Sequence, residues 1–160
     1  MRSFEIETDL AAPAAAVWRR VTTQQGINDE LLPVLRMTMP RALRGITIGD
    51  APVGENLGRS WLLIFGLIPV DFDDLTIAEL EPGRRFLEQS TMLTQSRWRH
   101  ERIVESHGSG CRVTDRLGWQ GRARALGALF GLAVPVIFRH RHRRLRRRFG
   151  AAPALGRGGA

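Results

Sequence analysis

The sequence predicts an α+β fold in which a curved antiparallel β-sheet grips one long C-terminal helix. Two observations predict it. Between Arg124 and Phe149, apolar residues recur at steps of three and four, which is the pattern of an amphipathic helix. Residues 58–120 form a series of short β-type segments separated by tight turns. Because tight turns join antiparallel strands and a long helix needs a large apolar surface, we expect the helix to lie across the concave face of the sheet.

The rest of the chain divides into about six to seven strands in total, with two short helices after the first strand. Residues 3–9 alternate as in a half-buried strand. Pro13 and the alanines after it favour the start of a helix, and a second helix is expected over residues 22–32. Residues 41–57 are rich in Gly and Pro and predict an irregular connection. Further strands are expected at residues 35–39, 58–65, 70–80, 85–92, 97–105 and 111–120.

A chain of 160 residues with 43% apolar and 25% charged residues indicates one globular domain. We expect this domain to cover residues 1–149 and a disordered, Gly- and Ala-rich tail to cover residues 150–160. The sequence shows no apolar signal segment and no apolar run long enough to span a bilayer. Cys111 is the only cysteine, which excludes an intrachain disulfide. These features predict a cytoplasmic protein without a transmembrane segment.

Three segments resemble one known superfamily. Residues 4–7 (Phe-Glu-Ile-Glu) lead into residues 12–18 (Ala-Pro-Ala-Ala-Ala-Val-Trp). Residues 79–86 (Glu-Leu-Glu-Pro-Gly-Arg-Arg-Phe) form a strand, a turn and a strand, and a final strand precedes the long helix. Over residues 1–149 the chain resembles the START-like, Bet v 1-like superfamily, also called the SRPBCC family, with its polyketide cyclase-like members.

The resemblance implies the helix-grip fold and an apolar cavity between helix and sheet. Members of the superfamily include lipid and hormone carriers, aromatic polyketide cyclases, subunits of ring-hydroxylating dioxygenases and stress-response activators. The sequence carries the catalytic signature of none of these branches. We therefore assign no catalytic residue, and the sequence leaves open whether the chain is an enzyme.

Polar side chains share one face of two strands that the turn at residues 107–110 joins. Asp115 is expected opposite, or one diagonal from, His100 or Arg102. If this face points inward, the group orients the polar end of a ligand or transfers protons. The alternatives are a buried, mutually satisfied ion pair and a solvated outer face. The polar candidates are Glu88, His100, Arg102 and Asp115.

Aromatic residues recur along the predicted strands and the long helix, and they could line a ligand pocket. The alternative for each of them is ordinary packing in the core. The sequence contains no tyrosine, so such a pocket would offer few neutral hydroxyl groups, which favours an apolar ligand. The aromatic candidates are Trp61, Phe65, Phe72, Trp98, Trp119 and Phe130.

The net charge of +8 comes almost entirely from the end of the long helix. Its arginines could face an anionic membrane surface, a nucleic-acid backbone or an acidic protein, although we do not expect a nucleic acid. The alternative is a solvated helix end whose arginine stems lie on apolar surface. The arginines are Arg139, Arg141, Arg143, Arg144, Arg146, Arg147 and Arg148.

The sequence shows no spacing typical of a metal site or of a cofactor-binding loop, and we expect neither a metal nor a cofactor. The preferred hypothesis is a protein that binds or carries a small hydrophobic ligand, lipid-, isoprenoid- or polyketide-like, in an internal cavity. The first alternative is a cyclase or dehydratase in which His100, with Asp115 or Arg102, moves protons. The second is an interaction protein that docks an anionic partner through its arginine-rich helix end.

Overall fold

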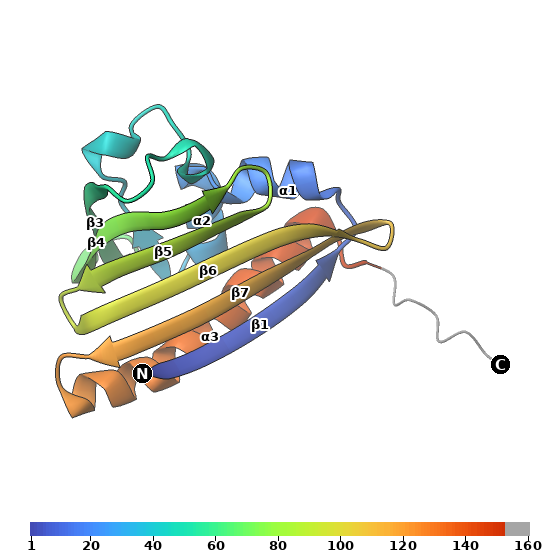
Figure 1. Cartoon of the computed structure of the whole chain (residues 1–160). Helices are drawn as coiled ribbons and strands as arrows, with labels where there is room; N and C mark the ends of the chain where they lie inside the picture. Colours follow the sequence, from blue (N-terminus) through green and yellow to red (C-terminus); the bar gives the residue numbers. More distant parts are fainter. Residues whose placement is uncertain (153–160) are drawn as a thin grey trace.

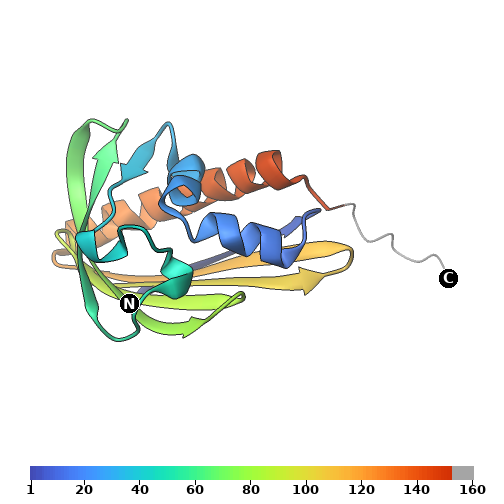
Figure 2. The same ribbon diagram turned by 90° about the horizontal axis from the view of Figure 1, so that it is seen from above.

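The computed structural model describes residues 1–152, and these form a seven-stranded sheet with three helices on one of its faces (Figures 1 and 2). The helices are α1 (Ala14–Val21), α2 (Gln24–Leu31) and α3 (Arg124–Phe149). The strands are β1 (Arg2–Leu10), β2 (Leu35–Met37), β3 (Asn56–Ile64), β4 (Ile68–Glu81), β5 (Arg85–Met92), β6 (Gln95–His107) and β7 (Gly110–Gly121). Two short 3₁₀ turns, η1 (Arg41–Leu43) and η2 (Ile48–Asp50), lie in the irregular connection before β3.

All neighbouring strands are antiparallel, in the order β1-β7-β6-β5-β4-β3-β2. The first strand therefore pairs with the last, and from β3 to β7 each strand pairs with the next in sequence. The β3–β4 hairpin turns up beside α3, so the sheet is curled (Figure 2). The predicted helix-grip fold and its order of elements are confirmed.

The helix α3 begins close to the end of β7 because two glycines meet there. A Cβ on Gly121 would lie 2.4 Å from the backbone nitrogen of Gly127, so only glycine fits at position 121. From this point α3 runs along β7 and β1 and then reaches α2. The C-terminal end of α3 is thereby held against α2.

The C-terminal end of α3 is also tied to β1. The Gly150 carbonyl accepts a hydrogen bond from the Ala11 amide, and the Ala152 amide donates to the Asp9 carbonyl. Ala151 forms an isolated bridge with Leu10. The predicted tail at 150–160 thus starts with three residues that pair with residues 9–11, and residues 153–160 lie outside the described part of the chain.

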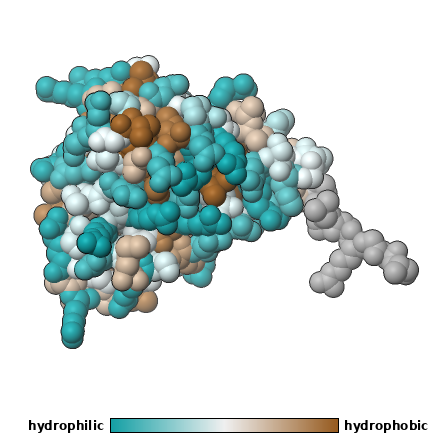
Figure 3. All heavy atoms as spheres, in the orientation of Figure 1, coloured by the Kyte–Doolittle hydropathy of each residue, from teal (hydrophilic) through white to brown (hydrophobic). Residues whose placement is uncertain are grey.

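The buried apolar side chains form two clusters. The larger cluster packs α1 and α2 against the sheet. The smaller one lies under α3 and contains Leu117, Trp119, Val134 and Phe138. By contrast, the outer face of the sheet, seen in Figure 3, is mainly hydrophilic. Side chains on the inner face therefore meet the helices, and this face carries the candidate site.

Candidate functional site

A cavity of about 460 Å³ lies between α3 and the inner face of β3 to β6, with α2 along one side. Leu129 of α3 and Val70 of β4 are exposed and belong to the mouth of the cavity. Most of the lining is aliphatic or aromatic. From α3 it includes Leu129, Phe130, Ala133, Val134, Ile137 and Phe138, and from the strands it includes Leu62, Ile64, Val70, Leu75, Phe86, Met92 and Trp98.

One wall of this cavity is polar. Asp73 on β4, Glu88 on β5 and His100 on β6 all line it from three adjacent strands. Glu88 and His100 are direct cross-strand partners, and His100 Nδ1 lies 3.6 Å from Glu88 Oε2. The Ser90 hydroxyl donates to Glu88 Oε1 at 3.2 Å. Glu88, Asp73 and His100 are all buried, so their ionisation depends on their neighbours rather than on water.

Both carboxyl groups have raised pKa values. Burial raises the pKa of Glu88 well above its usual value, and repulsion from Asp73 raises it further. Burial also raises the pKa of Asp73, to about 6, although hydrogen bonds with Glu88 and Ser90 oppose that shift. Near neutral pH this pair therefore retains a proton on Glu88, and the protonated carboxyl donates a hydrogen bond to Asp73.

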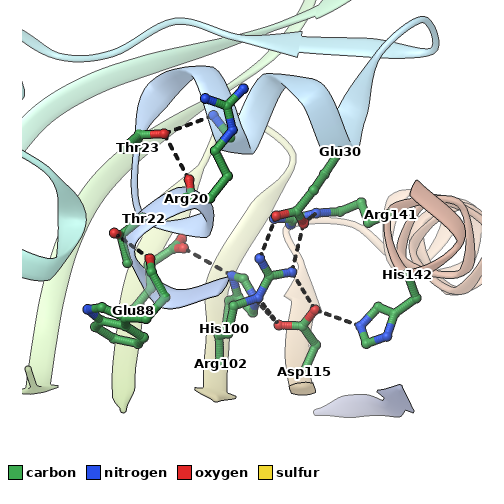
Figure 4. A network of polar contacts seen from close by, with 12 residues as sticks. Arg20, Thr22, Thr23, Glu30, Glu88, His100, Arg102, Asp115, Arg141 and His142 are labelled. Atoms are coloured by element: carbon green, nitrogen blue, oxygen red, sulfur yellow. Dashed lines mark hydrogen bonds and ion pairs between the residues drawn. The ribbon is translucent and has the colours of Figure 1, made fainter. Parts of the chain in front are cut away.

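Beneath this wall lies a buried ionic network centred on Arg102, which is completely inaccessible to solvent (Figure 4). Its guanidinium donates to both oxygens of Asp115 at 2.7 Å and to both oxygens of Glu30 at 2.8 and 2.9 Å. Arg141 of α3 donates to Glu30 at 3.0 Å, and His142 Nε2 lies 2.9 Å from Asp115 Oδ2. The network thus connects α2, β6, β7 and α3.

His100 joins the network to the cavity. Its Nε2 lies 2.8 Å from Asp115 Oδ1, and its Nδ1 points toward Glu88. Burial would raise the pKa of Asp115, but Arg102 outweighs it and holds that pKa well below the usual value. An ionised Asp115 only accepts hydrogen bonds, so Nε2 of His100 carries the proton. Burial lowers the pKa of His100 despite Asp115, and Nδ1 is therefore a free acceptor near neutral pH.

Four of the predicted ligand-binding residues line the cavity: Glu88, Trp98, His100 and Phe130. Arg102 and Asp115 lie one layer deeper, directly opposite each other on β6 and β7, which is one of the arrangements that the sequence left open. They form the buried ion pair that the sequence left as an alternative. Their contribution to the cavity is to hold His100.

The prediction that Trp61, Phe65 and Phe72 line the cavity is wrong. Trp61 and Phe65 are exposed, and Trp61 packs edge-on against Phe72 with ring centroids 5.5 Å apart. Arg59 covers the Phe72 ring at 3.8 Å. The cavity face of β3 instead carries Leu62 and Ile64, since alternate residues on a strand point to opposite faces.

Trp119 is also absent from the cavity lining. Its side chain is buried in the cluster under α3, and its Nε1–H donates to the Gly127 carbonyl at 3.4 Å. The role of Trp119 is therefore to pack the first turns of α3 against β7, which agrees with the core alternative.

The predicted patch of seven arginines also needs a correction. Arg141 is buried and bound to Glu30, so it cannot belong to a surface patch. Arg144 is half-buried, and its Nε donates to the Asp29 carbonyl of α2 at 2.9 Å. The remaining five are exposed: Arg139, Arg143, Arg146, Arg147 and Arg148.

Sequence reasoning missed Glu30, Asp71, Asp73 and His142, and it assigned Arg141 to the surface patch. A local sequence pattern could have placed two of these residues, Asp73 and Arg141, on buried faces. Asp73 alternates with Leu75 and Ile77 on one face of β4, so an inward carboxylate could have been inferred. Arg141 falls between Phe138 and Leu145 on the apolar stripe of α3. The surrounding arginines, however, made the whole segment look exposed to solvent.

Within residues 1–152, no helix is long and apolar enough to cross a membrane. The same residues contain no group of three or more side chains arranged to hold a metal ion.

Comparisons with known proteins show the fold. Protein CV1439 from Chromobacterium violaceum is similar at a TM-score of 0.69 and 14% identity, over 94% of this chain and 99% of that one. A START superfamily protein from Mycobacterium smegmatis gives 0.62 at 11% identity, over 92% and 95%. DynU16, from the dynemicin biosynthetic locus, gives 0.55 at 14% identity, over 93% of this chain and 48% of that one.

These similarities confirm the START-like, Bet v 1-like fold that the sequence predicted. At such low identities they show the fold alone. A family model described as "Domain of unknown function (DUF8410)" matches residues 8–149. No curated protein matches the chain.

Proposed function

The chain belongs to the DUF8410 family, described as a domain of unknown function, and we propose that it binds a small, mostly apolar molecule between α3 and the sheet. The observation that carries this proposal is the cavity itself. Its volume of about 460 Å³ falls within the usual range for small-molecule pockets, about 300–1,000 Å³. Protein interiors are otherwise closely packed, so a space of this size is expected to hold a ligand.

The composition of the cavity wall supports an apolar ligand with one polar end. Leu62, Ile64 and the α3 residues would surround an aliphatic or aromatic body. Glu88 and His100 would meet a polar group at the wall of β5 and β6. Carriage of a lipid-, isoprenoid- or polyketide-like molecule fits this division, and the resemblance to carriers of the same superfamily favours it.

Native mass spectrometry of the freshly purified chain tests this proposal. We expect a co-purifying small molecule that organic solvent extracts and that leaves with a defined mass. The absence of any such molecule, together with failure to take up a neutral apolar probe, would refute the proposal.

A second candidate is a cyclase or dehydratase that uses the same cavity. The observation that favours it is the pairing of Glu88 and His100 at 3.6 Å. Burial raises the pKa of Glu88 and lowers the pKa of His100, so the pair presents an acid and a base to the same point. Arg102 and Asp115 would then hold His100. A carrier returns its ligand unchanged, whereas the enzyme would convert it, and mass spectrometry after incubation distinguishes the two.

A third candidate, docking of an anionic partner, rests on the five exposed arginines of α3. Binding through them should weaken steeply as ionic strength rises, whereas binding in the cavity should not.

We also propose a cytoplasmic setting, because Cys111 is buried and free. Localisation of a fluorescent fusion tests that setting.

A further inference from the structure

In the ionic network beneath the cavity, the guanidinium groups and the carboxylates are equal in number. It contains two guanidinium groups, Arg102 and Arg141, and two carboxylates, Glu30 and Asp115. Arg141 also lines the cavity, but its Nε is bound to Glu30 and its guanidinium lies 4.7 Å from the centre of the Phe138 ring. The network therefore has no spare cation for the acids of the cavity wall.

Among residues 1–152, Asp73 is the cavity acid that has no counter-ion and also leaves one carboxylate oxygen without a hydrogen-bond partner. This residue is 3% exposed and lines the cavity. Its Oδ1 has no hydrogen-bond partner among residues 1–152, and no salt bridge within this range involves Asp73. By contrast, the neighbouring Asp71 accepts from the Phe72 amide at 2.8 Å and from the Thr94 hydroxyl. A buried carboxylate oxygen without a partner is rare in folded proteins, and a ligand would supply the missing donor.

Glu88 adds to the negative character of this part of the cavity wall. Since the pKa of Glu88 lies well above that of a free carboxyl and the pKa of Asp73 is about 6, the pair holds one proton and one negative charge near neutral pH. The other charged or titratable groups around it are Asp71 and Asp74 on β4, His100 on β6 and Arg141 on α3. Of these, Asp74 sits on the outer face of β4 and is paired with Arg59.

We propose, resting on the proposed cavity binding, that the cavity selects apolar molecules that carry a basic amine, and that Asp73 and Glu88 hold the ammonium group. An ammonium would donate a charge-assisted hydrogen bond to Asp73 Oδ1 and neutralise the pair. A ligand carboxylate would add a second negative charge at the same wall. A neutral alcohol could donate a hydrogen bond but would leave the charge uncompensated in an apolar space.

Competition among three ligands of equal chain length tests the proposal. The neutral probe N-phenyl-1-naphthylamine is bound first, and decylamine, decanol and decanoate are then compared as displacing ligands near pH 7.5. Because a hydrogen bond to a charged group is worth more than a neutral one, we expect decylamine to displace the probe at an about tenfold lower concentration than decanol. Decanoate should be the weakest.

Two neighbouring variants on β4 make the test specific. In Asp73→Asn the preference for decylamine over decanol should fall to about threefold or less, with probe binding retained as evidence of a folded cavity. The matched control Asp74→Asn removes the half-buried acid of the Arg59 pair on the outer face of β4 and should leave the preference unchanged.

The outcomes separate this inference from the proposed function. If the probe does not enter the wild-type cavity, the proposed function fails and this inference fails with it. If the probe binds but decylamine and decanol are equivalent, or decanoate is the best ligand through Arg141, only the inference is overturned. An equal loss of preference in Asp73→Asn and Asp74→Asn would also overturn it, because the effect would then be one of net charge.

Discussion

Arg102 and Asp115 face each other directly across β6 and β7 and are joined by two hydrogen bonds of 2.7 Å, although neither side chain reaches solvent. Both carboxylate oxygens of Glu30, from α2, accept hydrogen bonds from the same guanidinium. This arrangement fixes α2 over the sheet and places His100 at the cavity wall.

The variant Asp115→Asn should strongly destabilise the fold. It leaves the Arg102 charge short of one counter-ion in a site that solvent does not reach, and removing one partner of a buried ion pair costs about 3–5 kcal/mol. Urea unfolding measures the change in the free energy of unfolding. As a control, Glu5→Gln removes an exposed partner of Arg116 and should cost less than about 1 kcal/mol. Equal effects of the two variants would show that the buried network is not a special source of stability.

Arg141 should behave differently from its neighbours in the arginine run. In Arg141→Gln the buried Glu30 loses the guanidinium that binds it at 3.0 Å, and we expect a loss of about 2–4 kcal/mol in unfolding free energy. In Arg147→Gln, an exposed arginine of the same helix end is replaced, and the change should stay within about 0.5 kcal/mol. Thermal or urea unfolding of both variants provides the measurement. A mild effect of Arg141→Gln would show that its buried contact with Glu30 contributes little to the stability of the fold.

The stability of the protein should depend on pH through Asp73. The pKa of this group is 3.8 when free and about 6 in the folded chain. A raised folded-state pKa means that protonation favours folding. The stabilisation is therefore complete below the free value and is lost as the pH rises through about 6.

Comparison of the wild type with Asp73→Asn isolates this effect. Between about pH 4 and about pH 6.5, the wild type should lose on the order of 2–3 kcal/mol relative to the variant. Urea unfolding at several pH values gives the two curves. If they run parallel over this interval, the carboxyl of Asp73 is not perturbed in the folded protein.

Amine binding should show the opposite pH dependence. An ammonium ion needs the ionised form of Asp73, whose pKa is about 6, so the preference for decylamine over decanol should decline as the pH falls below that value. The ligand itself remains protonated throughout, because amines of this kind titrate near pH 10. Probe displacement at decreasing pH measures the decline. A preference that stays constant from about pH 7.5 to about pH 4.5 would exclude Asp73 as the anchor.

The sequence was sufficient for the fold because its signals are local. The three- and four-residue steps of α3 and the turn at 107–110 fix the long helix and the β6–β7 register, and the register places Arg102 opposite Asp115. Residues 61–65 are apolar without exception, however, so alternation could not tell which face of β3 is inner. A shift in the β3–β4 register at Leu62/Leu63 complicates that strand further.

The remaining parts of the site depend on contacts between distant segments. Glu30 meets Arg102 and Arg141 only after α2 and α3 have packed together, at separations of 72 and 111 residues. No local pattern marks such a partner. The exposed arginines around Arg141 also made its segment look solvated, although Phe138 and Leu145 place it on the buried side of α3.

Binding of N-phenyl-1-naphthylamine to the wild type and to a filled cavity tests the central claim most directly. Ala133 lines the cavity, whereas Val136 on the same helix is exposed and does not line it. We predict saturable binding to the wild type and to Val136→Trp, and its loss in Ala133→Trp, with circular dichroism showing that all three are folded. Equal binding by the two tryptophan variants, or no binding by the wild type, would contradict the claim that this chain holds its ligand between α3 and the sheet.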